Sequence, residues 1–576
     1  MKVINKDLFD SIIYIYNKNE IINIFIIFLF ILIISLLDVF SFTLIIPVFN
    51  FVFFDKIPNL FGVVNLENYK LDLSNLSKVI ILLVFLIIFF LKNAIIVAFN
   101  LFYLNIYKKI NLRVTKDLFS LFINQEYDFF IKKNSENALQ KLIDDTNNTN
   151  SFLQSFTLIS TELLFLIGLS ILLVFSNFKI AIFISITFLI AFLIYLKIFN
   201  KRIKKWGKNY RDSVSESQKI VLEGVTGLKD IIVYDLIKDF EKKYNVVVEQ
   251  NIHTSNRFVF LNNIQKYWLE IIGFFALTLA MIYFMLFNYN VNSLIPIFGL
   301  YTVAIFRFIS SLNRIVVHLN SLKFSYPSFQ GLLDTISYLK KANIAKSKEN
   351  FFLTKSIELK NVNFSYEDEN YKILNDVNLK IYKGESICIF GKNGSGKTTL
   401  LNLISGLLNP KSGSIIVDNK YNILSNRNSW IKNLSYVQQN IFLLDTSIKN
   451  NITLIDNGEI NYNRYDNLVK VLDLNNYFNE FPYKLDTKVG VDGTHLSGGQ
   501  KQMISLARCL YKDSELIIFD EPTSALDEVK SSLFRNLLIS MKKKKTIIVV
   551  THEKNLFEGC FDKTFEITSG ILKIKK

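Results

Sequence analysis

Six apolar runs dominate the first 317 residues of this 576-residue chain. About 20 apolar residues in a helix are enough to cross the roughly 30 Å of hydrocarbon in a bilayer. The runs cover approximately residues 21–54, 79–104, 158–175, 181–198, 258–287 and 294–317. The first is longer than a span requires and contains Asp38 and Pro47, and only a tight hairpin, Ser176 to Lys179, separates the third from the fourth. The sequence therefore predicts six transmembrane helices.

Basic residues at the ends of these runs predict their orientation. The segment after the second run contains Lys108, Lys109, Arg113 and Lys116, and the segment after the fourth contains Arg202, Lys204, Lys205 and Lys208. Residues 288–292, between the fifth and sixth runs, include no basic side chain. Because basic loops stay in the cytoplasm, both termini and both long loops are expected there. Helical spacing such as Leu118, Phe119, Leu121, Phe122 predicts helices that continue beyond the bilayer; disordered basic loops are the alternative.

Charge and composition bear on other classes of protein. The net charge is +16, but the basic residues flank apolar runs instead of forming one stripe, so no nucleic-acid partner is expected. The 53 Phe residues fit lipid-facing helices and fit an AT-rich genome equally well. Cys388, Cys509 and Cys560 have neither zinc nor disulfide spacing, which favours a reduced cytoplasmic setting. The first 20 residues lack a cleavable signal pattern, so the first run is expected to be retained.

The pattern of the chain changes near residue 350. A polar, lysine-rich stretch over 339–352 is expected to link a transmembrane domain, 1–338, to a second domain, 353–576. In the second part, short β-rich runs punctuated by Gly, Asn and Asp alternate with helical segments. That alternation is typical of α/β nucleotide-binding domains.

A phosphate-binding loop follows the predicted strand 386–390. Its residues match the P-loop pattern position for position: Gly391, Lys392, Asn393, Gly394, Ser395, Gly396, Lys397 and Thr398, followed by Thr399. Glycines let successive backbone N–H groups surround phosphates, and the N-terminus of the next helix adds positive potential. In this pattern Lys397 reaches the β/γ-phosphates and Thr398 ligates Mg²⁺. ATP and Mg²⁺ are therefore the expected cofactors, and the fold class is a membrane α-helical domain with six transmembrane helices plus an α/β P-loop ATPase domain.

A second buried strand, 515–519, ends in two acids, Asp520 and Glu521. Downstream of a P-loop, Asp520 is expected to hold the magnesium shell. Glu521 is placed to orient or deprotonate the attacking water, which is the positioning that phosphoryl transfer requires. A surface pair of acids is the alternative interpretation.

Between these motifs lies Leu496-Ser497-Gly498-Gly499-Gln500, and here the chain resembles the ATP-binding-cassette family. The resemblance implies that Ser497, Gly498, Gly499 and Gln500 clamp the γ-phosphate bound by an opposite subunit. It also implies roles for Tyr366 (stacking on adenine), Gln439 (sensing Mg²⁺ and the membrane domain), Asp527 within 524–527 (dimer contact) and His552 (γ-phosphate switch). Glu521, His552 and Gln439 are thus the catalytic candidates, and Thr398, Gln439 and Asp520 the metal candidates.

The order of domains is similar to that of exporters, which carry both parts on one chain. One P-loop and one signature per chain imply a homodimer, although a heterodimer stays open. One motif departs from the family: exporters read Thr-x-Val-Gly-Glu-Arg-Gly before the signature, whereas residues 487–493 read Thr-Lys-Val-Gly-Val-Asp-Gly. The frame is kept and the charge pair is altered, which puts the detail of coupling through this loop in doubt.

Three stretches of the membrane part resemble PglK-type flippases of lipid-linked oligosaccharides: 124–130 with Asn134-Ser135, 227–231, and 304–307 with 311–315. This resemblance implies a flippase of the bacterial inner membrane; export of lipid A, other lipids or drugs is the alternative. Lys92, Lys266 and Arg307 are the candidate substrate path, because cations suit a lipid pyrophosphate. Pairing of Lys92 with Asp38, Glu162 or Glu270 is the plainer interpretation. Neither the glycan nor the lipid carrier follows from the sequence.

Overall fold

The chain folds into two compact units. The computed structural model describes residues 16–44, 48, 59–60, 64–65, 75–132, 136–176, 178–286, 291–341, 351–366, 372–454, 459–552, 557 and 559–575. Unit 1 comprises Met1–Asn124 and Asn134–Asn343, and unit 2 comprises Gln125–Lys133 and Ile344–Lys576.

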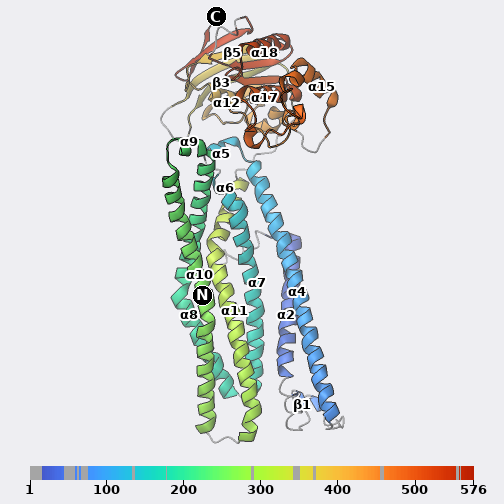
Figure 1. The fold of residues 1–576 in the computed structure, drawn as a ribbon, viewed down its shortest axis with the longest axis vertical. Coiled ribbons are helices and arrows are strands. Elements are labelled where there is room, and N and C mark those ends of the chain that lie inside the picture. Colours follow the sequence, from blue (N-terminus) through green and yellow to red (C-terminus); the bar gives the residue numbers. More distant parts are fainter. Residues whose placement is uncertain are drawn as a thin grey trace. The chain divides into compact units, whose positions relative to one another are not determined.

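Unit 1 is built from long helices (Figure 1). They are α2 (Lys18–Thr43), α4 (Asn75–Ile123), α7 (Thr146–Ser176), α8 (Phe178–Thr226), α10 (Ile237–Leu286) and α11 (Val291–Lys341). Shorter elements are the antiparallel pair β1 (Asn59–Leu60) and β2 (Val64–Asn65), α6 (Glu136–Gln140), the π-helical turn η2 (Lys141–Asp145) and α9 (Leu228–Val233). Each predicted run lies or begins in its own long helix. The prediction of six helices is therefore confirmed, as are the hairpin after α7 and the extension of α4 and α8 beyond their apolar runs.

Hydropathy separates the spans from their extensions. Among the described residues, five helices are long and apolar enough to cross a membrane: Asn19–Ser41, Lys78–Ile123, Ala138–Phe175, Ala181–Thr226 and Tyr301–Lys340. Helix α10 does not meet this length and hydropathy criterion over its described residues, and its predicted run, 258–287, extends past them. Many large apolar side chains on these helices are exposed, for example Phe90 at 71% and Phe175 at 86%. A hydrocarbon environment would make that exposure favourable.

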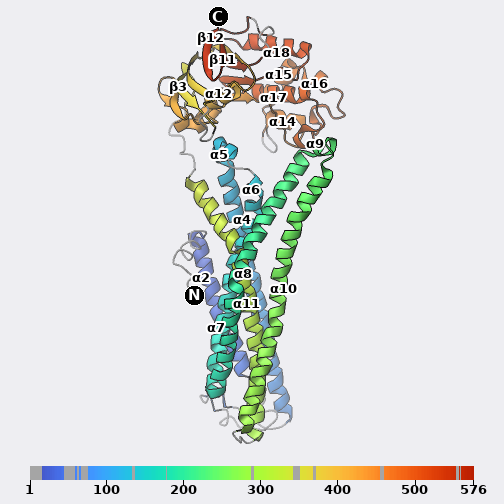
Figure 2. The ribbon, with the colours of Figure 1, turned by 90° about the vertical axis from the view of Figure 1, so that its left-hand side faces the viewer.

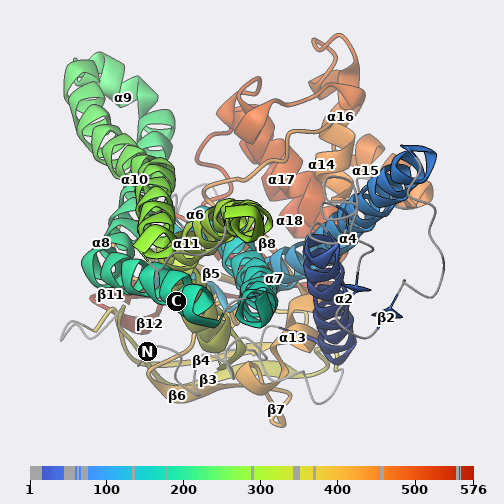
Figure 3. The same ribbon diagram turned by 90° about the horizontal axis from the view of Figure 1, so that it is seen from below.

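Two groups of helices flank α7 and α11, which pack along each other. Helices α2 and α4 lie on one side, and α8 and α10 on the other (Figure 3). A stacked Phe188–Phe308 pair joins α8 to α11, with ring centroids 5.6 Å apart. Close approaches to α11 occur at two glycines: a Cβ on Gly207 of α8 would overlap the backbone of Phe324, and one on Gly273 of α10 would lie 2.5 Å from Ile309. Only glycine permits the backbone approach at Gly207, whereas at Gly273 the missing side chain makes room for that of Ile309.

Two boundaries of the units differ from a simple division of the chain. Helix α5 (Tyr127–Lys132) lies between α4 and α6 in sequence, yet it belongs to unit 2. Of the stretch predicted as the linker, 339–352, the first residues continue α11 to Lys341. At its other end Phe351 is buried, with its ring stacked 4.4 Å from that of Tyr421 in the core of unit 2.

Unit 2 contains two sheets. The larger has the order β12 (Ile571–Lys575), β11 (Lys563–Thr568), β5 (Ser386–Gly391), β10 (Thr546–Val550), β9 (Leu516–Asp520), β8 (Leu434–Val437), and all neighbours are parallel except β11 and β12. The smaller is antiparallel, with the order β4 (Leu374–Tyr382), β3 (Ser356–Phe364), β6 (Ser412–Val417), β7 (Tyr421–Asn422). The helices are α12 (Lys397–Ile404), α13 (Arg427–Lys432), α14 (Ile448–Thr453), α15 (Tyr462–Val471), α16 (Leu474–Tyr477), α17 (Gly498–Lys512) and α18 (Glu528–Met541). The 3₁₀ turns are η3 (Leu424–Asn426), η4 (Lys484–Asp486) and η5 (Val491–Gly493).

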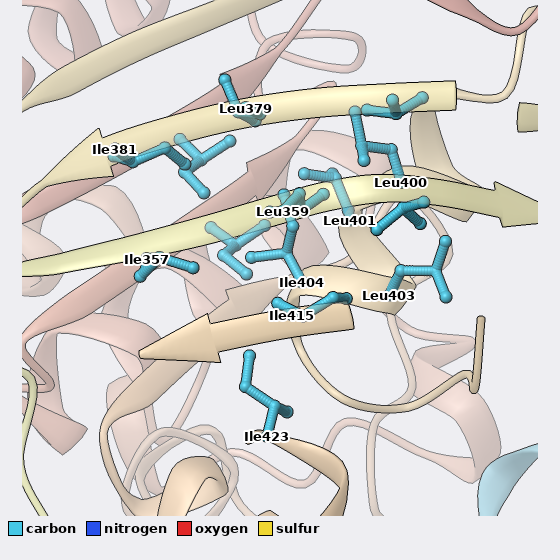
Figure 4. Close-up of a cluster of buried hydrophobic side chains, with 14 of the residues drawn as sticks. Ile357, Leu359, Leu379, Ile381, Leu400, Leu401, Leu403, Ile404, Ile415 and Ile423 are labelled. Carbon is cyan, nitrogen blue, oxygen red and sulfur yellow. The ribbon is translucent and has the colours of Figure 1, made fainter. Parts of the chain in front are cut away.

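The larger sheet is covered on both faces, which explains why its strands read as continuous apolar runs. Successive residues of β9, such as Ile518 and Phe519, point to opposite faces of the sheet and enter different cores. One core lies between the sheet, helix α12 and the smaller sheet, where Leu400 and Leu401 meet Leu359 and Leu379 (Figure 4). The other core lies under α14, α15, α17 and α18. Burial on both faces holds the strand ends in fixed positions.

Candidate ATP site

The parallel register brings three loops to one edge of the larger sheet. Val550 of β10 pairs with Ile389 of β5 on one side and with Asp520 of β9 on the other. The carboxyl ends of these three strands therefore lie next to one another. Ligands of open α/β sheets bind at this edge.

The loop after β5 has the backbone of a phosphate cradle. Gly394 and Gly396 adopt φ values of 78° and 100°, in the left-handed region that glycine permits without strain, and Gly396 is the N-cap of α12. The Ser395 hydroxyl oxygen is enclosed without a hydrogen-bond partner among the described residues. Lys397 is buried, and its ammonium donates to the main-chain oxygens of Gly391 at 2.9 Å and Lys392 at 3.1 Å. The loop thus presents an orphan hydroxyl, a helix N-terminus and an ammonium to an anion.

Asp520 and Thr398 meet beside this loop. Asp520 is buried, and it accepts hydrogen bonds from the Thr398 hydroxyl and from the Tyr436 hydroxyl, the latter at 3.3 Å. Burial raises the pKa of Asp520, although the hydrogen bond from Thr398 opposes that shift. A carboxylate and a hydroxyl in contact are hard oxygen ligands, so this pair fits Mg²⁺.

Glu521 lies at the centre of the convergent side chains. The Gln439 amide donates to its Oε2 at 3.0 Å, while Lys397 Nζ and His552 Nδ1 lie 4.0 and 3.7 Å from its Oε1. Its backbone φ of 50° is uncommon for a side chain other than glycine, asparagine or aspartate. The bond from Glu521 N–H to Val550 O, 2.9 Å long, and that from Gln502 Nε2 to Glu521 O, 3.0 Å long, hold this conformation.

The signature residues form the start of α17. The Ser497 hydroxyl caps the helix by accepting from Gln500 N–H, and the Gln500 side-chain oxygen in turn accepts from Ser497 N–H. A Cβ on Gly499 would lie 2.9 Å from Ala525 O, so the signature packs against the loop that precedes α18. Asp527 caps α18, and its hydrogen bond with Lys530 lowers its pKa. Gln502 binds that loop as well, because its Oε1 accepts from Ala525 N–H at 3.1 Å.

Two further predicted features lie near these groups. The Tyr366 hydroxyl shares a 3.3 Å hydrogen bond with the Thr399 hydroxyl, which ties the tyrosine to the start of α12. In the altered loop, η5 exposes Val491, and Lys501 donates to Asp492 O at 2.7 Å. Lys501 thus satisfies a main-chain oxygen of the loop from outside the motif, whereas the family motif carries an acid and a basic residue in sequence.

Comparison with known proteins identifies the family. The ABC transporter transmembrane region matches residues 24–308, and the ABC transporter ATPase domain matches residues 374–524. The chain belongs to the ABC transporter family. Its second unit is the ATP-binding ATPase domain of such a transporter, and the first is its membrane-spanning region.

Similar proteins include bacterial exporters. A heterocyst differentiation ATP-binding protein, HepA, from Nostoc sp. is 29% identical over 64% of this chain, and the match spans 60% of that protein. ATP-dependent lipid A-core flippases of Francisella tularensis and Yersinia pestis are 25% and 23% identical over 81% and 78% of this ABC transporter, and the matches span 76% and 77% of their lengths. The structure of a bacterial Atm1-family ABC exporter with ATP bound aligns with a TM-score of 0.73 at 17% identity, covering 96% of this chain and 94% of that one. The fold is that of an ABC exporter.

The structure separates the three basic residues assigned to the substrate path of this ABC transporter. Lys92 of α4 and Arg307 of α11 both reach Asp38 of α2, with N–O distances of 2.9 and 3.5 Å. Lys266 instead pairs along α10 with Glu270 at 3.8 Å, and 60% of its side chain is exposed. The plainer interpretation of Lys92, an ion pair with Asp38, is confirmed.

The Asp38 pairs lie close to a second ion pair. Arg314 of α11 and Glu162 of α7 form a two-point ion pair: Nη2 donates to Oε2 at 3.0 Å, and Nε pairs with Oε1. Arg307 interacts electrostatically with both residues. The five side chains on α2, α4, α7 and α11 thus comprise three cations and two carboxylates. Arg307 also lies 4.7 Å from the ring centroid of Phe165.

Sequence reasoning missed several residues that the fold places at functional positions. Gln502 and Tyr436 position Glu521 and Asp520, as described above. In unit 2, Glu126 before α5 binds Arg427 at 2.9 Å and accepts from Asn409 at 2.8 Å, and Arg427 donates to Asn409 at 2.6 Å. Only Gln502 could have been found from the sequence, because it lies five residues after Ser497 on the same helix and so close to the signature.

Proposed function

We propose that this ABC transporter is a Mg²⁺-dependent ATPase that flips a phosphate-bearing glycolipid across the bacterial inner membrane, and that the lipid is a lipid-linked oligosaccharide. The observation that supports an anionic lipid is the Asp38 cluster, where three cations and two carboxylates lie on four membrane helices. Cations pair with phosphate oxygens, and a charged head group does not cross hydrocarbon unaided. Lipid A-core is the second candidate cargo, because curated relatives carry that activity in their names.

The chain's own groups suffice for the chemistry of ATP hydrolysis. Gly394, Ser395 and Gly396 would surround the phosphates, and Lys397 would exchange its main-chain acceptors for phosphate oxygens. Tyr366, which follows β3, is hydrogen-bonded to Thr399 near the start of α12, and it would stack on the base. Asp520, Thr398 and Gln439 would hold Mg²⁺, which when bound neutralises phosphate charge. Glu521 would take the proton of the attacking water, since Gln439 orients its carboxylate and His552 lies beside it.

We also propose that the working unit is a homodimer. Ser497 and Gly498 start α17, and Asp527 caps α18, so both lie on the same rigid unit as the P-loop. A signature from a second copy would complete each site under two-fold symmetry. The dimer predicts complementation: Lys397→Ala and Ser497→Arg are each inactive alone. Mixed dimers regain ATPase activity, because both lesions fall in one composite site and the other is intact. Mixtures that stay inactive, although heterodimers form, would refute the shared site.

Reconstitution tests the cargo. Proteoliposomes would receive labelled lipid-linked oligosaccharide, lipid A-core or a hydrophobic dye, and the label reaching the opposite leaflet would be counted with and without ATP. The control is Glu521→Gln, which should bind ATP but not transport. We expect ATP-dependent transfer of the oligosaccharide lipid. Transfer of lipid A-core alone would assign the second candidate, and extrusion of dyes without lipid transfer would overturn the lipid proposal.

A further inference from the structure

Helices α8 and α10 enclose a groove of about 730 Å³ that the ATP site and the Asp38 cluster do not use. Its lining runs from Ala191 to Asn209 on α8 and from Thr254 to Trp268 on α10. The two helices lie side by side and α9 joins them at one end (Figure 2). Such a volume falls within the usual range of small-molecule sites.

The two ends of the groove differ in polarity. Because α8 and α10 are antiparallel, the early residues of the α8 wall face the late residues of the α10 wall. One end is therefore apolar, with Ile194 and Ile198 opposite Phe260, Leu261 and Ile264, and it overlaps the predicted spans. The other end is cationic, with Arg202 and Lys205 on α8 and Arg257 on α10. Tyr195, Trp206 and Trp268 also line the groove, and Trp206 lies beside the cationic end, where hydrocarbon would meet water.

The groove has binding capacity that the chain leaves unused. Arg202, Lys205 and Arg257 are exposed, and none forms an ion pair or a hydrogen bond with any residue that the structure describes. Gln265, which is only 2% exposed, accepts from Asn320 Nδ2 through Oε1 at 3.2 Å. Its Nε2 has no acceptor in the described part of the chain. Asn320 Oδ1 likewise has no donor among the described residues, so this pair of amides leaves one donor and one acceptor unsatisfied beside the groove.

We infer that this groove binds an anionic phospholipid of the cytoplasmic leaflet. Its phosphate lies among Arg202, Lys205 and Arg257, and the first part of an acyl chain lies along the apolar wall. The groove matches such a lipid because its cationic end is followed by an apolar end that continues into the membrane spans. The inference rests on the membrane location of α8 and α10, and not on the cargo proposed above.

Tryptophan fluorescence reports on the site directly. The chain has three tryptophans; Trp206 and Trp268 line the groove, whereas Trp430 is fully buried in unit 2 and supplies a constant background. The protein would be placed in nanodiscs with brominated phosphatidylglycerol or brominated phosphatidylcholine, without nucleotide. We expect stronger quenching by the anionic lipid at equal mole fraction.

The decisive variant is Arg202→Gln combined with Lys205→Gln and Arg257→Gln. It should reduce the preference for brominated phosphatidylglycerol by at least about tenfold, since each of the three basic residues near a membrane favours anionic lipid severalfold. The matched control removes the same charge from exposed lysines of unit 1, by Lys229→Gln, Lys238→Gln and Lys242→Gln, and should keep the preference.

Three results would overturn the inference. Equal quenching by both lipids would show no anionic site, and loss of preference in the control variant would show only a general charge effect. Absence of quenching by either lipid would show that another surface, such as a second copy of the chain, covers the groove. Because no ATP is present, failure of lipid transport in the reconstitution assay does not affect this outcome, and failure here leaves the transport proposal standing.

Discussion

Asp38 provides the sharpest test of how unit 1 is held together. Its carboxylate is 11% exposed and lies 2.9 Å from Lys92 Nζ, which is 7% exposed. Each of its two ion pairs amounts to about 5 kcal/mol at an effective dielectric constant of about 20, before desolvation is subtracted. Removing one member of a buried pair typically costs about 3–5 kcal/mol. We expect Asp38→Asn to lower the free energy of unfolding by about 3 kcal/mol, the lower end, because the amide oxygen still accepts a hydrogen bond.

The measurement is an SDS titration in mixed micelles, followed by the helical circular-dichroism signal. Lys92→Met should cost less, since Asp38 keeps Arg307 at 3.5 Å. The control is Lys266→Met, whose partner Glu270 is 3.8 Å away in an exposed pair worth about 1 kcal/mol or less. If Asp38→Asn and Lys266→Met cost the same, the idea that the Asp38 cluster stabilises unit 1 is refuted.

Three further predictions concern unit 2. Glu521→Gln should retain ATP affinity and lose at least about a hundredfold in turnover, because the amide cannot accept the proton; turnover and nucleotide affinity are measured separately. The raised pKa of Asp520 means that its carboxylate protonates at a higher pH than usual, so Mg²⁺-dependent nucleotide affinity should fall on mild acidification, and Asp520→Asn should remove that pH step. The contribution of Asp520 to folding stability depends on pH in the opposite direction. Folding favours its protonated carboxyl, so this stabilisation is present below the pKa of the unfolded chain and is lost as pH rises through the raised folded value. Arg427→Gln should lower the free energy of unfolding, measured by thermal unfolding, by about 2–3 kcal/mol, because the Glu126 carboxylate loses its charged partner. Adding Glu126→Gln to the same chain should restore part of that stability.

The ATP site is readable from sequence because its motifs are local. Gly391 to Thr398 carries its own strand, turn and helix, and the order of Asp520, Glu521 and His552 follows from α/β alternation. What the sequence does not contain is the register that places Val550 between Ile389 and Asp520. For the same reason Gln502 and Tyr436 were missed: their partners are distant in the chain, and no local pattern distinguishes them from ordinary polar residues.

The membrane unit shows a different limit. Hydropathy finds apolar runs, but nearly all sides of such helices are apolar, so it does not tell which face is buried. Lys92 and Lys266 look equivalent in sequence, yet the first is buried against Asp38 and the second is exposed. The groove between α8 and α10 was equally invisible, because its charges come from two segments about 50 residues apart that only the antiparallel pairing aligns.

Both walls of the groove approach α11 closely at a glycine, one on α8 and one on α10. Gly207 fixes α8 to α11 near the cationic end, and Gly273 fixes α10 to α11 beyond the apolar end. A residue larger than glycine at either position would push that wall away from α11, so the width of the groove depends on both contacts. A lipid in the groove would therefore lie between two helices whose spacing is set by how closely each approaches α11.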